Sequence, residues 1–191
     1  MPSDSAKRFL DVTLAIIAAT LLCIPLAVVY CLVRFTSRGP AIHWSKRVGI
    51  NNALFMMAKF RTMRIDAPQV ASHLMQNPRM YLTPIGGFLR KFSLDELPQL
   101  YNILRGDLSF VGPRPALFNQ ADLVALRTEK GVHVLKPGLT GWAQVNGRDE
   151  LPIPVKVAFD EYYLHHQSLL FDIKIIVKTF ADVIRGSGVS H

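Results

Sequence analysis

Two adjacent carboxylates, Asp95 and Glu96, stand out in this sequence because they follow a strongly basic half of the chain. Between Val12 and Leu94 the only acidic residue is Asp66, whereas ten lysines and arginines occur there. A carboxylate pair in basic surroundings suits a site that holds a phosphate group and a divalent metal ion together. The pair is therefore the first candidate for a catalytic site.

The residues around this pair predict the start of a helix. Ser93-Leu-Asp-Glu96 is a capping-box pattern, which places both acids in the first turn. Because proline is tolerated only near a helix start, Pro98 favours an alternative in which Asp95 itself is the N-cap. Either arrangement keeps Asp95 ionised and favours phosphate nearby, since helix N-termini attract negative charge. On this pattern alone, the two acids could also serve only to cap the helix.

The composition points towards a membrane. The 191 residues suffice for one domain, half of them are hydrophobic, and the mean hydropathy is +0.23. The formal net charge of +8 suits nucleic acid, anionic lipid or phosphorylated substrates. Aromatic residues are not interleaved with the basic ones, and no zinc or helix-turn-helix signature occurs, so we expect no nucleic acid partner. Cys23 and Cys31 suggest no disulfide framework, which makes a reducing compartment the default.

An uncharged stretch of 22 residues, Val12 to Val33, is long enough to cross a hydrocarbon core of about 30 Å. Pro25 lies inside it and predicts a kink or a break. Basic residues flank both ends, so the positive-inside rule places both flanks in the cytoplasm. A helix that enters the membrane, bends at Pro25 and leaves on the same side satisfies this rule; a single span with a mild kink is the alternative. The flanking bases are Lys7, Arg8, Arg34, Arg38, Lys46 and Arg47.

The residues after the apolar stretch predict a β-hairpin. Ala41–Trp44 and Leu54–Phe60 have strand composition, and the turn formers of Gly49–Asn52 lie between them. At the exit of the second strand, Lys59 and Arg61 alternate with apolar residues. They could reach a phosphate group or simply be solvated.

Further helices are expected along the second half of the chain. The last one is amphipathic, with Ile173 and Phe180 on its apolar face and lysines at the border. This face could lie in a membrane interface or pack on the core of the domain. The expected elements are a mixed helix and loop at 66–87 and helices at 116–130, 155–166 and 168–185.

A loop rich in turn formers, Lys136 to Arg148, also carries polar and basic side chains. Loops of this kind often line functional sites, although an ordinary surface connection would have the same composition. His165 and His166 lack a ligand partner at metal-binding spacing, and we expect them at the surface.

Five motifs in order make the sequence resemble the bacterial sugar transferases, the monotopic phosphoglycosyl transferases that begin glycan assembly on a polyprenyl phosphate. The resemblance covers nearly the whole chain, and the combination is specific although each motif alone is weak. The motifs are Lys7-Arg8-x-x-Asp11, Lys59-Phe-Arg-Thr-Met63, Ser93-Leu-Asp-Glu-Leu-Pro-Gln-Leu100, Gly112-Pro-Arg-Pro115, and Lys136-Pro-Gly-Leu-Thr-Gly-Trp142 with Asn146-Gly-Arg148.

The resemblance implies a helix-rich α/β fold at the bacterial inner membrane. Residues 1–38 would form a re-entrant membrane helix broken at Pro25. Residues 39–191 would form a small catalytic domain with a β-hairpin on the cytoplasmic face, held by amphipathic interfacial helices. The family often has serine before the membrane proline, where this chain has Ile24. Thr20 or a neighbouring residue would then have to bond the carbonyl that the break leaves free.

The resemblance also implies an activity, the transfer of a sugar 1-phosphate from a UDP-sugar to polyprenyl phosphate with Mg²⁺ and release of UMP. Asp95 corresponds to the covalent nucleophile of the family, and Glu96 would hold the metal or orient the pair. The Pro113-Arg114-Pro115 segment would line the nucleotide site. The further candidates are Lys59, Arg61, Arg90 and Arg148 for phosphate contacts and Asp160 as a supporting carboxylate.

Two other classes of function compete with this one. A non-catalytic adaptor that binds anionic membrane lipid explains the charge and the apolar stretch, but it gives the 93–100 motif no purpose. Nucleic acid binding is disfavoured by an intramembrane segment. The transferred sugar and the oligomeric state, a homodimer included, stay open.

Overall fold

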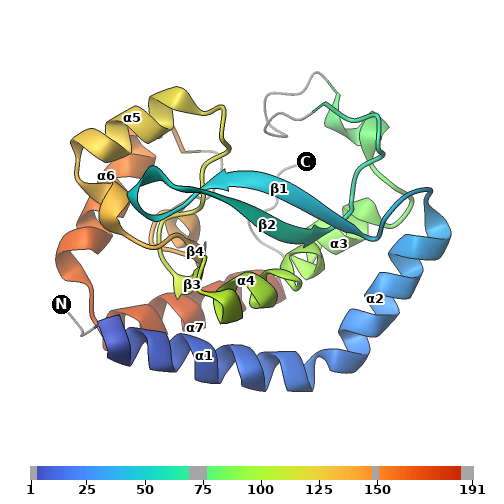
Figure 1. Cartoon of the computed structure of the whole chain (residues 1–191), viewed down its shortest axis with the longest axis horizontal. Coiled ribbons are helices and arrows are strands. Elements are labelled where there is room, and N and C mark those ends of the chain that lie inside the picture. Colours follow the sequence, from blue (N-terminus) through green and yellow to red (C-terminus); the bar gives the residue numbers. More distant parts are fainter. Residues whose placement is uncertain (1–3, 69–76, 148–150, 186–191) are drawn as a thin grey trace.

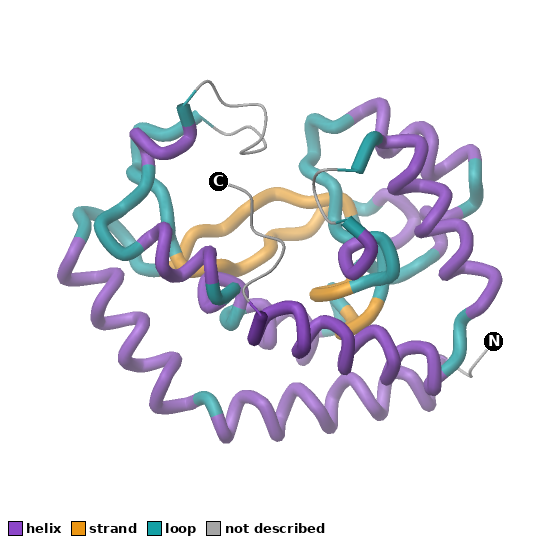
Figure 2. Tube along the Cα trace, turned by 180° about the vertical axis from the view of Figure 1, so that it is seen from behind, coloured by secondary structure: helices purple, strands orange, loops and turns teal. Residues whose placement is uncertain are grey.

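The computed structural model describes residues 4–68, 77–147 and 151–185. Figures 1 and 2 show a helix-rich chain in which two small sheets lie among the helices, which confirms the expected helix-rich α/β composition. The helix α1 (Asp4–Leu21) runs along the lower edge of Figure 1, and α2 (Cys23–Thr36) rises along its right side.

A bend of 66° between α1 and α2 confirms the predicted break in the apolar stretch. Leu22 is the residue between the two helices, and Pro25 lies in the first turn of α2. Proline fits there because it has no N–H to donate to the carbonyl of Leu21. Thr20 does not supply the compensating bond considered above, since its hydroxyl donates to the Ile16 carbonyl at 2.9 Å. Among the described residues, no single helix is long and apolar enough to cross a membrane, whereas the bent pair reaches that length and composition together.

The predicted hairpin is present and longer than expected. Strands β1 (Ile42–Val48) and β2 (Leu54–Phe60) pair antiparallel, with Trp44 opposite Ala58. The first strand extends beyond the predicted end at Trp44 because every residue of β1 finds a partner in β2. The connecting turn η1 (Ile50–Asn52) has Asn51 and Asn52 at positive φ, a conformation that asparagine tolerates well.

A second sheet joins segments that are distant in the sequence. Strands β3 (Ser109–Val111) and β4 (Gly138–Thr140) pair in parallel, with α5 (Ala121–Glu129) between them in the sequence. The two strands meet so closely that a Cβ on Gly138 would lie 2.1 Å from the Gly112 nitrogen. This pairing places the Pro113-Arg114-Pro115 segment beside residues 136–138. The remaining elements are η3 (Pro78–Tyr81), α3 (Gly86–Lys91), η4 (Leu94–Glu96), α4 (Gln99–Arg105), η5 (Val132–Val134), η6 (Gln144–Asn146), α6 (Ile153–His166) and α7 (Leu169–Arg185).

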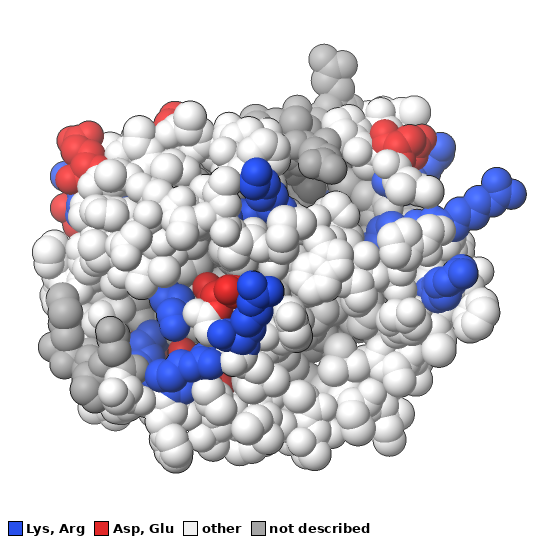
Figure 3. Space-filling model, in the orientation of Figure 1, with Lys and Arg blue, Asp and Glu red and all other residues white. Residues whose placement is uncertain are grey.

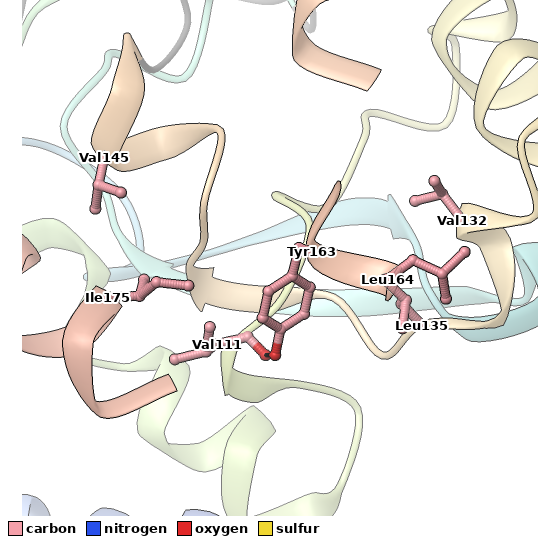
Figure 4. Close-up of a cluster of buried hydrophobic side chains, with 7 residues drawn as sticks. All are labelled: Val111, Val132, Leu135, Val145, Tyr163, Leu164 and Ile175. Atoms are coloured by element: carbon pink, nitrogen blue, oxygen red, sulfur yellow. Dashed lines mark hydrogen bonds between the residues drawn. The ribbon is translucent and has the colours of Figure 1, made fainter. Parts of the chain in front are cut away.

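The core forms where these elements meet. Tyr163 of α6 is buried between β3 and α7, and Figure 4 shows its hydroxyl directed towards Val111. A second cluster includes Ala15 of α1 and Ile103 of α4, and a third includes Val33 of α2. One side of each N-terminal helix therefore packs on the rest of the protein.

The other sides of these helices expose an apolar surface. Figure 3, drawn in the orientation of Figure 1, shows no charged side chain along the lower edge over α1. The helix α7 buries Asp172 and Ile175, whereas much of its predicted apolar face remains exposed. Both alternatives for this helix are thus realised in part, since it packs on the core through one side and presents an apolar stripe on another. The exposed apolar residues include Phe9, Ile17, Leu21, Ile24 and Phe35 of α1 and α2, and Leu170, Ile173, Val177 and Phe180 of α7.

The motif Lys7-Arg8-x-x-Asp11 attaches α1 to three other elements. Lys7 forms an ion pair with Asp172 of α7. Arg8 donates to the carbonyls of Ile103 and Leu104 at the end of α4, at 2.5 and 2.7 Å. The carboxylate of Asp11 accepts hydrogen bonds of 3.0 Å from the side chain of Ser109 and the backbone of Phe110.

Replacing Asp11 by Ala is expected to lower the free energy of unfolding by about 2–4 kcal/mol, because one buried and one partly buried donor lose their acceptor. The midpoint of thermal unfolding in detergent should fall by roughly 5–15 °C. Asp11→Asn retains one acceptor oxygen and should cost less. Equal midpoints for the original protein and Asp11→Ala would show that these bonds do not stabilise the attachment of α1.

Candidate active site

Asp95 and Glu96 lie in the short 3₁₀ turn η4, and α4 begins only at Gln99. The predicted capping box is therefore wrong. Ser93 has a left-handed backbone with φ of +54°, whereas a capping serine needs an extended one, and its side chain forms no capping bond. The alternative with Asp95 as N-cap is also wrong, because Pro98 occupies that position of α4. The two acids thus do not act as helix caps.

Glu96 is held by two basic side chains from different parts of the chain. Lys59 Nζ of β2 lies 2.7 Å from Glu96 Oε1, and Arg114 Nη2 lies 3.3 Å from the same oxygen. Burial raises the pKa of Glu96, but these two positive charges outweigh it and lower the pKa to about 2. The Glu96 carboxylate is therefore ionised at any physiological pH.

Asp95 is buried beside Glu96 but lacks such partners. Within the described part of the chain, its carboxylate forms no hydrogen bond or ion pair. Burial raises the pKa of Asp95, and the charge of Lys59 partly opposes this effect. The negative charge of Glu96 raises the pKa further, while Arg90 and Arg114 lower it. The pair thus combines an anchored, ionised carboxylate with a buried one whose oxygens remain available for chemistry.

Asn102 of α4 positions Lys59 and was missed by the sequence analysis. Its side chain is fully buried, accepts a bond of 2.9 Å from the Ala58 N–H and donates one of 2.8 Å to the Met56 carbonyl. The amide therefore satisfies backbone groups of β2 as a neighbouring strand would. This contact fixes β2 against α4 and places Lys59 beside η4.

The backbone of the Pro113-Arg114-Pro115 segment is fixed because each of its three carbonyls accepts a hydrogen bond. The carbonyl of Pro113 accepts from the Gly138 N–H at 3.0 Å. The carbonyl of Arg114 accepts from Arg127 Nη1 at 2.8 Å, and that of Pro115 from Arg47 Nη1 at 3.2 Å. A backbone fixed by three different elements carries the Arg114 side chain to Glu96.

Asp160 supports this arrangement through Arg127. Asp160 Oδ2 accepts bonds from Arg127 Nε at 3.0 Å and Nη2 at 2.7 Å, and both side chains are buried. Burial raises the pKa of Asp160, whereas Arg127 lowers it. Asp160 is thus separated from Glu96 by two residues, Arg127 and Arg114. Arg127 was missed because an arginine in a surface helix carries no sequence signal of this contact.

The remaining predicted basic residues lie in different places. Arg90 Nε donates to Thr62 Oγ1 at 2.9 Å, and the charge of Arg90 acts on Asp95. The guanidinium of Arg61 donates to carbonyls after the end of α2, so its phosphate contact stays a prediction. Arg148 lies outside the described residues.

Comparison with known proteins identifies the group to which this arrangement belongs. The bacterial sugar transferase family matches residues 2–186. The chain is 40% identical to the galactosyl transferase CpsE of Streptococcus agalactiae over 96% of its length, and 37% identical to the exopolysaccharide production protein ExoY of Sinorhizobium fredii over 96%. It is 34% identical over 95% of its length to the UDP-N-acetylgalactosamine-undecaprenyl-phosphate N-acetylgalactosaminephosphotransferase of Aeromonas hydrophila.

These relatives differ in length. The alignment covers 87% of ExoY but only 43% of CpsE and 44% of the Aeromonas protein. The chain therefore spans less than half the length of two of these relatives.

Proposed function

The chain belongs to the bacterial sugar transferase family and is a transferase, and from this premise we propose that it moves a sugar 1-phosphate from a UDP-sugar to polyprenyl phosphate. The transfer would begin the assembly of a membrane-linked glycan. Support for the two substrates comes from the Aeromonas relative, whose name contains both a UDP-sugar and undecaprenyl phosphate.

The observation that carries the proposal is the contrast between the two carboxylates of η4. Asp95 is buried without an ionic partner among the described residues, whereas Lys59 and Arg114 hold Glu96. In the first step, an Asp95 oxygen attacks the β-phosphorus of the UDP-sugar. The bond from that phosphorus to the bridging oxygen breaks, and UMP leaves with the electron pair. The product on the protein is an aspartyl-phosphosugar.

In the second step, a phosphate oxygen of the polyprenyl phosphate attacks the same phosphorus. The bond to the Asp95 oxygen breaks, which restores the carboxylate and yields the polyprenyl diphosphate sugar. Splitting the transfer in this way lets one small site serve a soluble donor and a lipid acceptor in turn. Lys59, Arg90 and Arg114 would bind phosphate oxygens, because these three residues are close enough for their charges to lower the pKa of Asp95.

The carboxylates of Asp95 and Glu96 also suit Mg²⁺, the proposed cofactor. Among the described residues, no group of three or more potential ligands occurs, so Asp95 and Glu96 would hold the ion as a pair. Two carboxylates suffice, because Mg²⁺ in such sites takes further ligands from water and substrate phosphates. When bound, the ion would neutralise charge on the diphosphate.

The membrane part of the proposal rests on α1 and α2. Residues 1–38 would enter the bacterial inner membrane and return at the bend near Pro25, with residues 39–191 on the cytoplasmic face. The bent pair and the exposed apolar stripe of α7 support this arrangement. Labels at Met1 and His191 should then react only from the cytoplasmic side, and labelling of Met1 from the periplasm would contradict it.

The proposed activity is tested by UMP release from a panel of UDP-sugars with purified protein, polyprenyl phosphate and Mg²⁺. One or a few sugars should give rapid release, and the same panel would identify the transferred sugar. Absence of UMP with every sugar would contradict the proposal.

Arg114→Ala is expected to raise KM for the UDP-sugar about 10- to 100-fold, because the side chain loses its charge-assisted bonds to phosphate or uracil oxygens. Arg114→Lys should recover part of this loss, since lysine keeps the charge but not the planar fork. Arg105→Ala removes an exposed arginine at the end of α4 and serves as the control. An unchanged KM in both Arg114 variants would remove this residue from the donor site.

A further inference from the structure

A basic pocket lies at the end of α2, where the chain leaves the apolar helix pair. Its volume is about 420 Å³, and Figure 3 shows basic side chains gathered at this right-hand edge of the molecule. The pocket contains three arginines from two segments of the chain. Its lining residues are Ser37, Arg38, Arg61, Arg64, Ile65 and Asp66.

Arg61 forms the rigid wall of this pocket. Its guanidinium donates to the carbonyls of Ser37 and Gly39 at 3.0 and 3.2 Å and also to that of Arg38. The side chain is buried, yet its Nε has no hydrogen-bond partner among the described residues. This Nε is shielded from solvent, so Arg61 contributes its positive charge to the pocket rather than a free donor.

The pocket holds more positive than negative charge. Asp66 is committed to Arg64, with bonds of 3.0 and 2.7 Å to Nε and Nη2. The guanidinium of Arg38 forms no hydrogen bond or ion pair within the described residues. Arg34 is near enough that its charge, after burial, lowers the pKa of Arg61. The lining residues of the pocket therefore carry a net positive charge.

The position of the pocket indicates which kind of anion it would bind. The last turns of α2 expose Leu32 and Phe35, the latter with 85% of its surface accessible, and Ile65 beside the pocket is 71% exposed. Apolar side chains thus give way to arginines within one helical turn. At a membrane surface, this boundary corresponds to the depth at which lipid phosphates meet the hydrocarbon region.

We propose that this pocket binds the phosphate of an anionic membrane lipid. Arg38 and the Nη1 group of Arg64, to which Asp66 does not bond, would bind the phosphate oxygens, and Ile65 and Phe35 would contact the first part of the acyl or prenyl chains. The proposal rests on the membrane attachment proposed above. A bulk phospholipid and the polyprenyl phosphate acceptor share this chemistry, so the experiment must separate the two sources.

The test is a thermal-unfolding series of the full chain in neutral detergent with added lipid. Phosphatidylglycerol, polyprenyl phosphate, phosphatidylcholine and inorganic phosphate are added separately. Binding of a lipid at ten times its Kd should raise the unfolding midpoint by about 3–6 °C. The double variant Arg38→Gln/Arg64→Gln should need at least about ten times more lipid for the same shift. Arg105→Gln/Lys130→Gln removes two exposed charges elsewhere and is the matched control.

A shift with phosphatidylglycerol that is weakened only in the pocket variant supports the proposal with a bulk phospholipid as the ligand. A weakened shift with polyprenyl phosphate alone supports it with the acceptor as the ligand. Equal shifts in the pocket and control variants, or a shift with phosphatidylcholine as large as that with either anionic lipid, would overturn the proposal. The measurement of the unfolding midpoint requires no catalytic turnover. UMP release without any lipid-induced rise in the midpoint would therefore contradict the pocket proposal but not the proposed function.

Discussion

Asp95→Asn is expected to abolish UMP release in the absence of lipid, with a loss of about 10⁴-fold or more in the rate. The original protein, given UDP-sugar and Mg²⁺ alone, should release up to one UMP per active site and then stop. Asparagine preserves the shape of the side chain but lacks the anionic oxygen that attacks phosphorus in the proposed mechanism. Rapid-quench measurement of UMP distinguishes this burst from slow background hydrolysis.

Two controls make this result specific to Asp95. Asp122→Asn changes an aspartate in the first turn of α5 and should retain the full burst. The thermal midpoint of Asp95→Asn should stay at or above that of the original protein, because burial disfavours a charge at this position. A burst that persists in folded Asp95→Asn would contradict the assignment of the nucleophile.

The second large effect concerns the pH dependence of the burst. In the proposed mechanism attack requires the Asp95 carboxylate, so the rate should fall as the pH drops through the pKa of Asp95, which burial raises and bound Mg²⁺ would lower. Lys59→Gln removes a charge that lowers this pKa, so the acid limb of the pH–rate profile should move to higher pH. Glu96→Gln removes a charge that raises it, so the limb should move to lower pH, whatever the loss in maximal rate.

These opposite displacements are measured from burst rates between about pH 4 and 8. On the acid side of the limb, moving the pKa of Asp95 by one pH unit changes the burst rate at a fixed pH about tenfold. Lys130→Gln, which alters an exposed pair with Glu161, should leave the limb in place. Displacements in the same direction for Lys59→Gln and Glu96→Gln would contradict the electrostatic account of the dyad.

Local sequence patterns predicted the elements more successfully than the contacts between them. The second strand, the break near Pro25 and the last two helices follow from composition and periodicity within one segment. The capping box at Ser93 failed although its residues match the pattern, because the pattern does not determine the sign of φ. A left-handed serine breaks the cap and leaves Asp95 and Glu96 on a separate turn.

The contacts that prepare the site depend on long-range packing. Asn102 binds β2, 44 residues earlier in the chain, and Arg127 binds Asp160, 33 residues later. Neither residue differs in type from the polar residues of an ordinary surface helix, so no single-segment pattern distinguishes them. Asp160 could be predicted only through the family resemblance, and the structure adds that it acts on Arg114 through Arg127.

The proposed covalent intermediate is tested most directly by the mass of the protein after incubation with UDP-sugar and Mg²⁺ without lipid. The proposed mechanism predicts an increase equal to one phosphosugar per chain, located on the peptide that contains Asp95. Addition of polyprenyl phosphate should then return the protein to its original mass. An unmodified protein, together with UMP that appears only when lipid is present, would show direct transfer between the two substrates and contradict the mechanism.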